Sequence, residues 1–327
     1  MTKLTRSETA RWLLERDDFL ILTHRRPDGD TLGSASVLCR GLVQMGKTAH
    51  ILENPETTEK YLHLLEGMIQ AQAREEQTLI CVDTAAPGML QGNAQGLQER
   101  IALRIDHHGT ATSFAPWELV DSDAGSTGDI IYDTLMEMGV TLDKPMAEAL
   151  YTAVSTDTGC FRYANTNAHS YLVAAACAKA GGDLHTINQT IFDTNSLAKL
   201  RLQGWMVENI QFFREGKLAL CALPKAVEQR LGVTEDDMEN VSGFPRSIQG
   251  VHMAATLRET GAGTVKVSVR ALPGYDAAAV CQAFGGGGHK GAAGATLSMG
   301  LEDAAQAVTA EMIKLTMDNY GIAFGNE

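Results

Sequence analysis

The chain has 327 residues, of which 44% are hydrophobic and 20% are charged, which is typical of a globular protein. Its formal net charge of −13 argues against electrostatic binding of duplex DNA, because that binding needs broad basic patches. The length predicts two domains. The apolar runs are all shorter than the roughly 20 residues needed to cross a bilayer, so we expect no membrane association.

Six cysteines are spread along the chain without a C-x-x-C pair: Cys39, Cys81, Cys160, Cys177, Cys221 and Cys281. Several lie in apolar runs, and this pattern is typical of buried free thiols in a reducing compartment. Residues 1–16 have the pattern of a polar amphipathic helix and not of a signal peptide. We therefore expect a cytoplasmic protein.

Strand and helix patterns alternate through the first part of the chain. The expected strands are 19–23, 49–52, 78–83 and 101–106, and the expected helices are 7–15, 31–45, 58–66, 126–138, 145–156 and 169–180. Asp30 is the expected cap of the helix 31–45. The continuous apolar runs 78–83 and 101–106 indicate strands of a buried parallel sheet. The alternation predicts an α/β domain with a larger, mostly parallel sheet flanked by helices.

The pattern changes near residue 190. Residues 187–208 are almost entirely compatible with a helix, and we interpret them as a connection between domains. Further strands are expected at 217–223, 251–257, 264–270 and 295–298, and helices at 276–284 and 301–317. The predicted organisation is a metal-binding catalytic domain over 1–190, a helical linker over 191–212 and a smaller α/β domain with a mixed sheet over 213–327.

Residue types that commonly bind metals lie at the ends of three of the predicted strands. They are His24, Asp28 and Asp30 after the first strand, Asp83 at the end of the third, and Asp106, His107 and His108 at the end of the fourth, with Asp157 at the end of a helical run. The carboxyl ends of parallel strands are where sites are built. A buried carboxylate needs a cation or strong donors nearby. Imidazole with carboxylates suits a divalent ion such as Mn²⁺ better than a closed zinc site.

Each of these residues taken alone also has a purely structural explanation. His24 would then be an isolated loop histidine, and Asp28 and Asp30 would be turn and N-cap residues. Asp83 would cap a helix or make a hydrogen bond at a strand end. The complete set favours the metal site, because chance does not readily end several apolar runs in such residues.

In order and context, these residues resemble the four motifs of the DHH phosphoesterase superfamily: H-x-x-x-D-x-D from His24, Asp83, D-H-H from Asp106, and Asp157. The run GGGGHKGAAG, residues 285–294, is similar to the glycine-rich signature of the DHHA-type substrate domain. The compact length resembles bacterial nanoRNase/pAp phosphatase members. None of the motif positions is substituted, so we expect an active enzyme.

The resemblance implies a role for each residue. Two divalent ions are expected, Mn²⁺ with Mg²⁺ or Co²⁺ as alternatives. His24 and Asp28 would bind one ion, Asp30, His107 and Asp157 would bind the other, and Asp83 would bridge both. Asp106 would orient the histidines, and His108 would face the substrate phosphate. The expected catalytic residues are therefore Asp83, Asp106 and His108.

The expected substrate-binding residues are His108, Arg162, Arg270, Gly286, Gly287, Gly288, His289 and Lys290. Glycines allow consecutive backbone N–H groups to approach an anion, although a flexible hairpin loop also explains the run. The structural alternative for Arg270 is a solvated residue at a strand end, and the alternative for Arg162 is an ion pair with an acidic residue. Ser126 and Thr127 open a helix, where their N–H groups would bind an anion or simply belong to the N-cap.

The activity that the resemblance implies is hydrolysis of short oligoribonucleotides and dinucleotides such as pApA to 5′-mononucleotides, and of 3′-phosphoadenosine 5′-phosphate (pAp) to AMP. The expected partners are short single-stranded RNA and pAp, and the resemblance is compatible with a homodimer. Three alternatives remain: a family II inorganic pyrophosphatase, a RecJ-like single-strand exonuclease and a non-hydrolytic nucleotide-binding protein.

Overall fold

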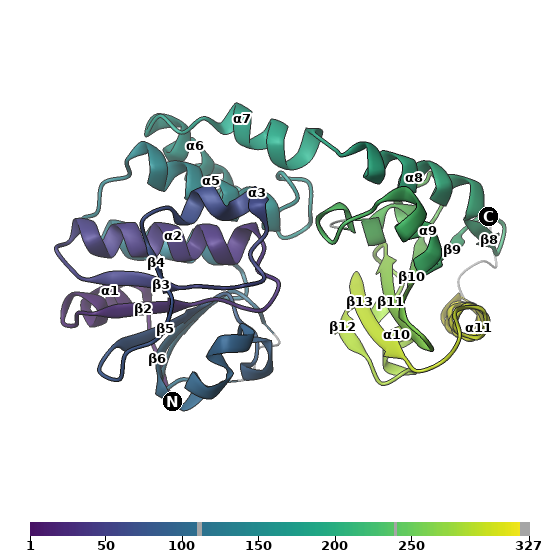
Figure 1. Ribbon diagram of the computed structural model, residues 1–327, viewed down its shortest axis with the longest axis horizontal. Coiled ribbons are helices and arrows are strands. Elements are labelled where there is room, and N and C mark those ends of the chain that lie inside the picture. Colours follow the sequence, from purple (N-terminus) through teal and green to yellow (C-terminus); the bar gives the residue numbers. More distant parts are fainter. Residues whose placement is uncertain (110–112, 239–240, 321–327) are drawn as a thin grey trace. The chain divides into compact units, whose positions relative to one another are not determined.

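The computed structural model describes residues 1–109, 113–238 and 241–320, and the chain divides into two compact units, Met1–Thr194 and Asn195–Glu327. Each unit is a sheet packed with helices (Figure 1). Among the described residues, no helix is both long and apolar enough to span a bilayer. All six cysteines are free thiols, and five are buried, whereas Cys160 is half-buried.

The first unit contains a seven-stranded parallel sheet in the order β1-β7-β6-β5-β2-β3-β4. Its strands are β1 (Thr2–Lys3), β2 (Phe19–Leu22), β3 (Ala49–Leu52), β4 (Ile69–Gln70), β5 (Thr78–Val82), β6 (Ile101–Asp106) and β7 (Trp117–Val120). Its helices are α1 (Arg6–Leu14), α2 (Gly29–Gln44), α3 (Glu59–Leu62), α4 (Thr127–Glu137), α5 (Lys144–Asp157), α6 (Ala168–Lys179) and α7 (Leu184–Asn188). The predicted fold class is thus confirmed for this unit.

The interior strand β2 is buried on both faces, which explains its continuous apolar sequence. Phe19 and Ile21 join the large core beneath α2 and α4, while Leu20 and Leu22 join a smaller core on the opposite face. The 3₁₀ segment η3 (Gly92–Arg100) packs on that second face through Ala94 and Leu97. Figure 1 shows α2 running along the sheet, and α5 packs against α2 and α4.

The strand order reverses direction at β2. From β2 the chain moves outward through β3 and β4, and then returns to place β5 on the other side of β2. A crevice forms beyond the carboxyl ends of the strands at such a switch point, and ligands bind there in open α/β sheets. The loop after β2 and the residue after β5 therefore meet at the position where this fold builds sites.

The second unit contains a six-stranded mixed sheet in the order β12-β13-β11-β10-β9-β8, in which the β9–β10 pair is parallel and the other pairs are antiparallel. Its strands are β8 (Gln211–Phe213), β9 (Leu218–Leu223), β10 (Met253–Gly261), β11 (Thr264–Ala271), β12 (Gly287–His289) and β13 (Ala292–Leu297). Its helices are α8 (Leu197–Asn209), α9 (Lys225–Leu231), α10 (Ala277–Gln282) and α11 (Leu301–Tyr320). The mixed sheet confirms the second part of the predicted fold class.

The long helical run predicted over 187–208 is interrupted. Helix α7 continues into a π-helical turn, η4 (Gln189–Asp193), and α8 begins afresh after Ser196. The Ser196 hydroxyl accepts a hydrogen bond from the N–H of Lys199, and such a side-chain cap starts a new helix. Leu202 and Met206 of α8 are buried in a core of the second unit.

Helices α2 and α5 approach each other so closely that Gly33 has no room for a side chain. A Cβ atom at Gly33 would overlap the carbonyl oxygen of Ala149 and lie 2.9 Å from the nitrogen of Ala153. Gly33→Ala should therefore push the helices apart and destabilise the protein by about 1–3 kcal/mol. The matched change Gly204→Ala lies at an exposed position of α8 with open space for the new methyl group, and it should be neutral or stabilising. Thermal melts of the two variants distinguish these results, and equal midpoints would contradict the close packing.

Candidate metal centre

The loop after β2 holds His24 in one orientation. The Asn54 side-chain amide donates a hydrogen bond to the carbonyl of His24 at 2.9 Å, which ties the loop to the end of β3. The imidazole Nδ1 of His24 lies 2.8 Å from the carbonyl of Arg25, so Nδ1 is the protonated nitrogen. Nε2 is then free to face Asp83 Oδ2 at 3.5 Å and Asp28 Oδ1 at 3.7 Å.

The prediction that Asp30 caps α2 is wrong, because Asp28 is the cap. Asp28 Oδ1 accepts from the N–H groups of Asp30 and Thr31, both at 3.1 Å. An N-cap side chain reaches the N–H groups two and three residues ahead, and that register belongs to Asp28. The carboxylate of Asp30 is therefore released from capping and lies buried in the crevice.

The amino end of α4 binds an anion, and that anion is the carboxylate of Asp30. Its oxygens accept from the N–H of Thr127 at 2.8 Å, the N–H of Gly128 at 3.1 Å and the hydroxyl of Ser34 at 3.0 Å. Ser126 accepts from the N–H of Asp129 and so caps α4 in the usual way. Ser126 is therefore the helix cap, and the N–H of Thr127 binds a carboxylate of the protein itself. Binding of a substrate anion by this pair stays a prediction.

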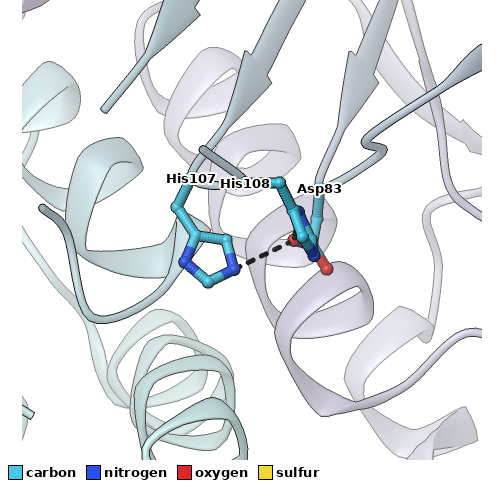
Figure 2. Close-up of side chains that lie close together, drawn as sticks. All are labelled: Asp83, His107 and His108. Atoms are coloured by element: carbon cyan, nitrogen blue, oxygen red, sulfur yellow. Dashed lines mark ion pairs between the residues drawn. The ribbon is translucent and has the colours of Figure 1, made fainter. Parts of the chain in front are cut away.

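Asp83 lies at the centre of the cluster of carboxylates and imidazoles. Its backbone has φ +51°, a left-handed conformation that costs about 1–3 kcal/mol in a non-glycine residue and is concentrated at functional sites. Thr127 donates its hydroxyl to Asp83 Oδ1 at 2.9 Å. His107 Nε2 and His108 Nδ1 each lie 3.7 Å from the same oxygen, and Figure 2 shows these three side chains at the ends of neighbouring strands.

Asp106, the last residue of β6, is fully buried and orients His108. Its Oδ1 accepts from His108 Nδ1 at 2.7 Å and from the His108 N–H at 3.2 Å. The buried guanidinium of Arg104 lies 3.8 Å from Asp106 Oδ2. Sequence reasoning missed Arg104, although a basic residue inside an apolar strand is itself a signal that a buried anion lies nearby.

Asp157 ends α5 and lies on the other side of His107. Its Oδ2 is 3.6 Å from His107 Nε2, and His107 Nε2 is also 3.9 Å from Asp30 Oδ2. The side-chain amide of Asn165 donates to Asp157 Oδ2 at 3.1 Å. Sequence reasoning missed Asn165. Arg162 is exposed, and its Nε donates to the carbonyl of Gly159 at 2.6 Å.

Burial and mutual repulsion perturb the carboxyl groups of this cluster. Burial, together with the charges of Asp83 and Asp157, raises the pKa of Asp30 well above its ordinary value. Burial also raises the pKa of Asp157 to about 7, with Asp83 contributing to the rise. Burial lowers the pKa of His108, but the hydrogen bond to Asp106 and the charge of Asp83 outweigh it and raise the pKa to about 9. The close approach of these carboxyl groups thus concentrates negative charge, which bound protons or cations would offset.

The donor atoms of the cluster are grouped closely enough to bind ions. Within each of three groups the donor atoms lie within 4.8 Å of one another: His24, Asp28 and Asp83; Asp30, His107 and Asp157; and Asp83, His107 and His108. Carboxylate oxygens and imidazole nitrogens are ligands of divalent ions such as Mn²⁺. A buried excess of carboxylates also needs cations. The residues therefore fit metal ions.

The metal-free protein should lose stability as the pH rises from about 4 to about 9. The pKa of Asp157 is about 7 in the folded chain and about 3.9 in the unfolded chain. The pKa of His108 is about 9 in the folded chain and about 6.5 in the unfolded chain. The folded state therefore binds more protons over this window, and raising the pH favours unfolding. Thermal melts in EDTA at pH 5.5 and 8.5 test this, and Asp157→Asn should shrink the difference. A midpoint that rises with pH would refute it.

The substrate residues predicted in the second unit lie on β11 and on a hairpin. Arg270, near the end of β11, is half-buried and donates to the hydroxyl of Ser242 at 3.2 Å. The glycine run forms the hairpin of β12 and β13 in place of an open loop, and Gly287, Gly288, His289 and Lys290 are exposed. Gly286 packs so tightly against the backbone of Gly294 that a Cβ would overlap its carbonyl oxygen. At least one glycine of the run is thus required by packing.

Two family models match this chain. The DHH family, N-terminal domain, matches residues 18–154, and the DHHA1 domain matches residues 222–316. The "bifunctional oligoribonuclease and PAP phosphatase NrnA" of Thermus thermophilus is 32% identical over 279 residues, covering 85% of this chain and 83% of that protein.

Solved structures share the fold. An exopolyphosphatase-related protein from Bacteroides fragilis superposes with a TM-score of 0.87 at 24% identity, covering 96% of this chain and 97% of that one. RecJ from Thermus thermophilus, solved in complex with Mn²⁺, has a TM-score of 0.54 at 15% identity, covering 94% of this chain and 53% of RecJ. Because the two domain models match in this order and the Thermus thermophilus NrnA is 32% identical, the chain belongs to the DHH/DHHA1 phosphoesterases.

Proposed function

We propose that this protein hydrolyses short oligoribonucleotides, including dinucleotides such as pApA, to 5′-mononucleotides and converts pAp to AMP. The observation that carries the proposal is the partly buried group of carboxylates and imidazoles around Asp83, on a chain 32% identical to an oligoribonuclease and PAP phosphatase. The negative net charge is compatible with a small anionic substrate, because cations in the crevice would offset the local repulsion.

In this proposal the three strand ends together bind two divalent ions. His24 and Asp28 would hold one ion, Asp30, His107 and Asp157 would hold the other, and Asp83 would serve as a ligand of both. Mn²⁺ is the expected ion, with Mg²⁺ and Co²⁺ as alternatives, because the ligand types suit all three. Bound there, the ions supply charge for the phosphoryl oxygens and lower the pKa of a water that serves as the nucleophile.

His108 is the proposed donor to the reacting phosphate. Asp106 holds its Nδ1 at 2.7 Å, which leaves Nε2 to donate a hydrogen bond. A hydrogen-bond donor at Nε2 complements negative charge on an equatorial oxygen of the phosphate. Fixed in this way, the group needs no reorganisation when charge develops on the phosphate.

The second unit would hold the remainder of the nucleotide. Arg270, His289 and Lys290 provide cationic or hydrogen-bonding groups for a phosphate or a base. The exposed glycines of β12 allow a ligand to approach the backbone. Arg162 of the first unit is the further proposed substrate contact. Recognition of one or two nucleotides by few groups suits short oligomers better than long polymers.

Turnover of a substrate panel in Mn²⁺ tests the proposal. The panel holds pApA, a five-nucleotide RNA, pAp, inorganic pyrophosphate and a 30-nucleotide single-stranded DNA, with products resolved by length. We expect mononucleotides from the short RNAs and AMP from pAp. Rapid cleavage of pyrophosphate alone would identify a pyrophosphatase, and degradation of the long DNA alone a RecJ-like exonuclease. Nucleotide binding without turnover would reject catalysis altogether.

A further inference from the structure

Thr127 connects two acidic side chains that come from different elements of the crevice. It is the first residue of α4 and is completely buried. Its hydroxyl donates to Asp83 Oδ1 at 2.9 Å, and its N–H donates to Asp30 Oδ2 at 2.8 Å. Asp83 follows β5 and Asp30 lies in the first turn of α2, so this single residue ties three segments together.

The hydrogen bond from the Thr127 hydroxyl fixes the plane of the Asp83 carboxylate. In this orientation Asp83 Oδ2 faces His24 at 3.5 Å, while Oδ1 faces His107 at 3.7 Å. Rotation about the Cβ–Cγ bond by a quarter-turn would turn both oxygens away from the imidazoles, and the hydroxyl of Thr127 opposes it by binding Oδ1. A carboxylate fixed before the ion arrives loses less conformational freedom on binding, and partners that fix metal ligands typically contribute 10–100-fold in affinity.

We infer that Thr127 is a positioning residue that holds Asp83 and Asp30 in the orientation in which they bind divalent ions. The inference rests on the proposed metal role of these two carboxylates. It assigns Thr127 a function beyond the start of a helix, since the helix cap itself is Ser126, whose hydroxyl accepts from the N–H of Asp129.

Three variants separate positioning from helix stability. Thr127→Val keeps the β-branched shape and the backbone N–H but removes the hydroxyl donor. Thr127→Ser keeps the hydroxyl. Ser126→Ala removes the cap of α4 at a cost of about 1 kcal/mol but leaves both bonds to the carboxylates. The readouts are Mn²⁺ affinity of the metal-free protein by isothermal titration calorimetry, and thermal midpoint in EDTA.

Thr127→Val should weaken Mn²⁺ binding about 10–100-fold, while Thr127→Ser stays within about threefold of the parent. Ser126→Ala should lower the thermal midpoint without changing Mn²⁺ affinity. Parent-like affinity in Thr127→Val would overturn the inference, as would equal losses in Thr127→Val and Ser126→Ala. If Thr127→Val does not fold, a loss of affinity in Thr127→Ser would overturn it too. Absence of Mn²⁺ binding in the parent itself would instead reject the proposed function.

Discussion

Asp83→Asn should reduce kcat on pApA by about 10³-fold or more while leaving the protein folded. The substitution keeps the shape of the side chain and its hydrogen bond from Thr127, but it removes the negative charge that faces three imidazoles. Because Asp83 is the proposed ligand of both ions, Mn²⁺ affinity should fall together with the rate.

The control for this prediction is Asp123→Asn, which makes the same chemical change at an exposed loop position. Its rate and Mn²⁺ affinity should match those of the parent. Circular dichroism and thermal melts in EDTA establish that both variants are folded. Removal of the buried charge relieves repulsion, so metal-free Asp83→Asn should melt no lower than the parent. Retention of parental activity by Asp83→Asn would disprove the assigned role.

His108→Asn should lower kcat about 10²–10³-fold and leave Mn²⁺ affinity within about threefold of the parent. The reason for the difference from Asp83 is that His108 is proposed to contact the phosphate and not the ions. Asp106→Asn should act through the same group, because it replaces the carboxylate that accepts from His108 Nδ1 at 2.7 Å.

The double variant tests whether the two residues act as a unit. If Asp106 works by orienting His108, the losses in Asp106→Asn and His108→Asn should be strongly non-additive. His185→Asn, at an exposed position of α7, is the matched control and should be neutral. Additive losses, or loss of Mn²⁺ from His108→Asn, would show that His108 has a different role from the one proposed.

Much of the first unit was predictable because its strands are apolar runs that end in polar residues. The sheet, its parallel direction and the strand-end positions of Asp83 and Asp106 follow from that pattern. Strands β1, β4 and β7 were not predicted. Strands β1 and β4 have only two residues each, and β7 (Trp117–Val120) is short and interrupted by Glu118, which is buried beside Arg104. A strand that contains a charged residue can be recognised only when the buried partner of that residue is known.

The arrangement of donors around the carboxylates was not predictable from one sequence. Thr127 lies 44 residues beyond Asp83, and the bond between them depends on how α4 packs against the sheet. The assignment of the α2 cap to Asp30 failed for a related reason: Asp28 and Asp30 are both good caps, and only backbone register distinguishes them. Spacing alone therefore gives the metal-ligand candidates but not the residues that hold them.

Anomalous diffraction from crystals grown with Mn²⁺ locates bound manganese directly. We expect two manganese peaks, one beside His24 and Asp28 and the other beside Asp30, His107 and Asp157, with Asp83 touching both. Crystals of Asp83→Asn should lose at least one peak. A parent crystal with no manganese at these side chains, or with manganese bound only elsewhere, would contradict this expectation.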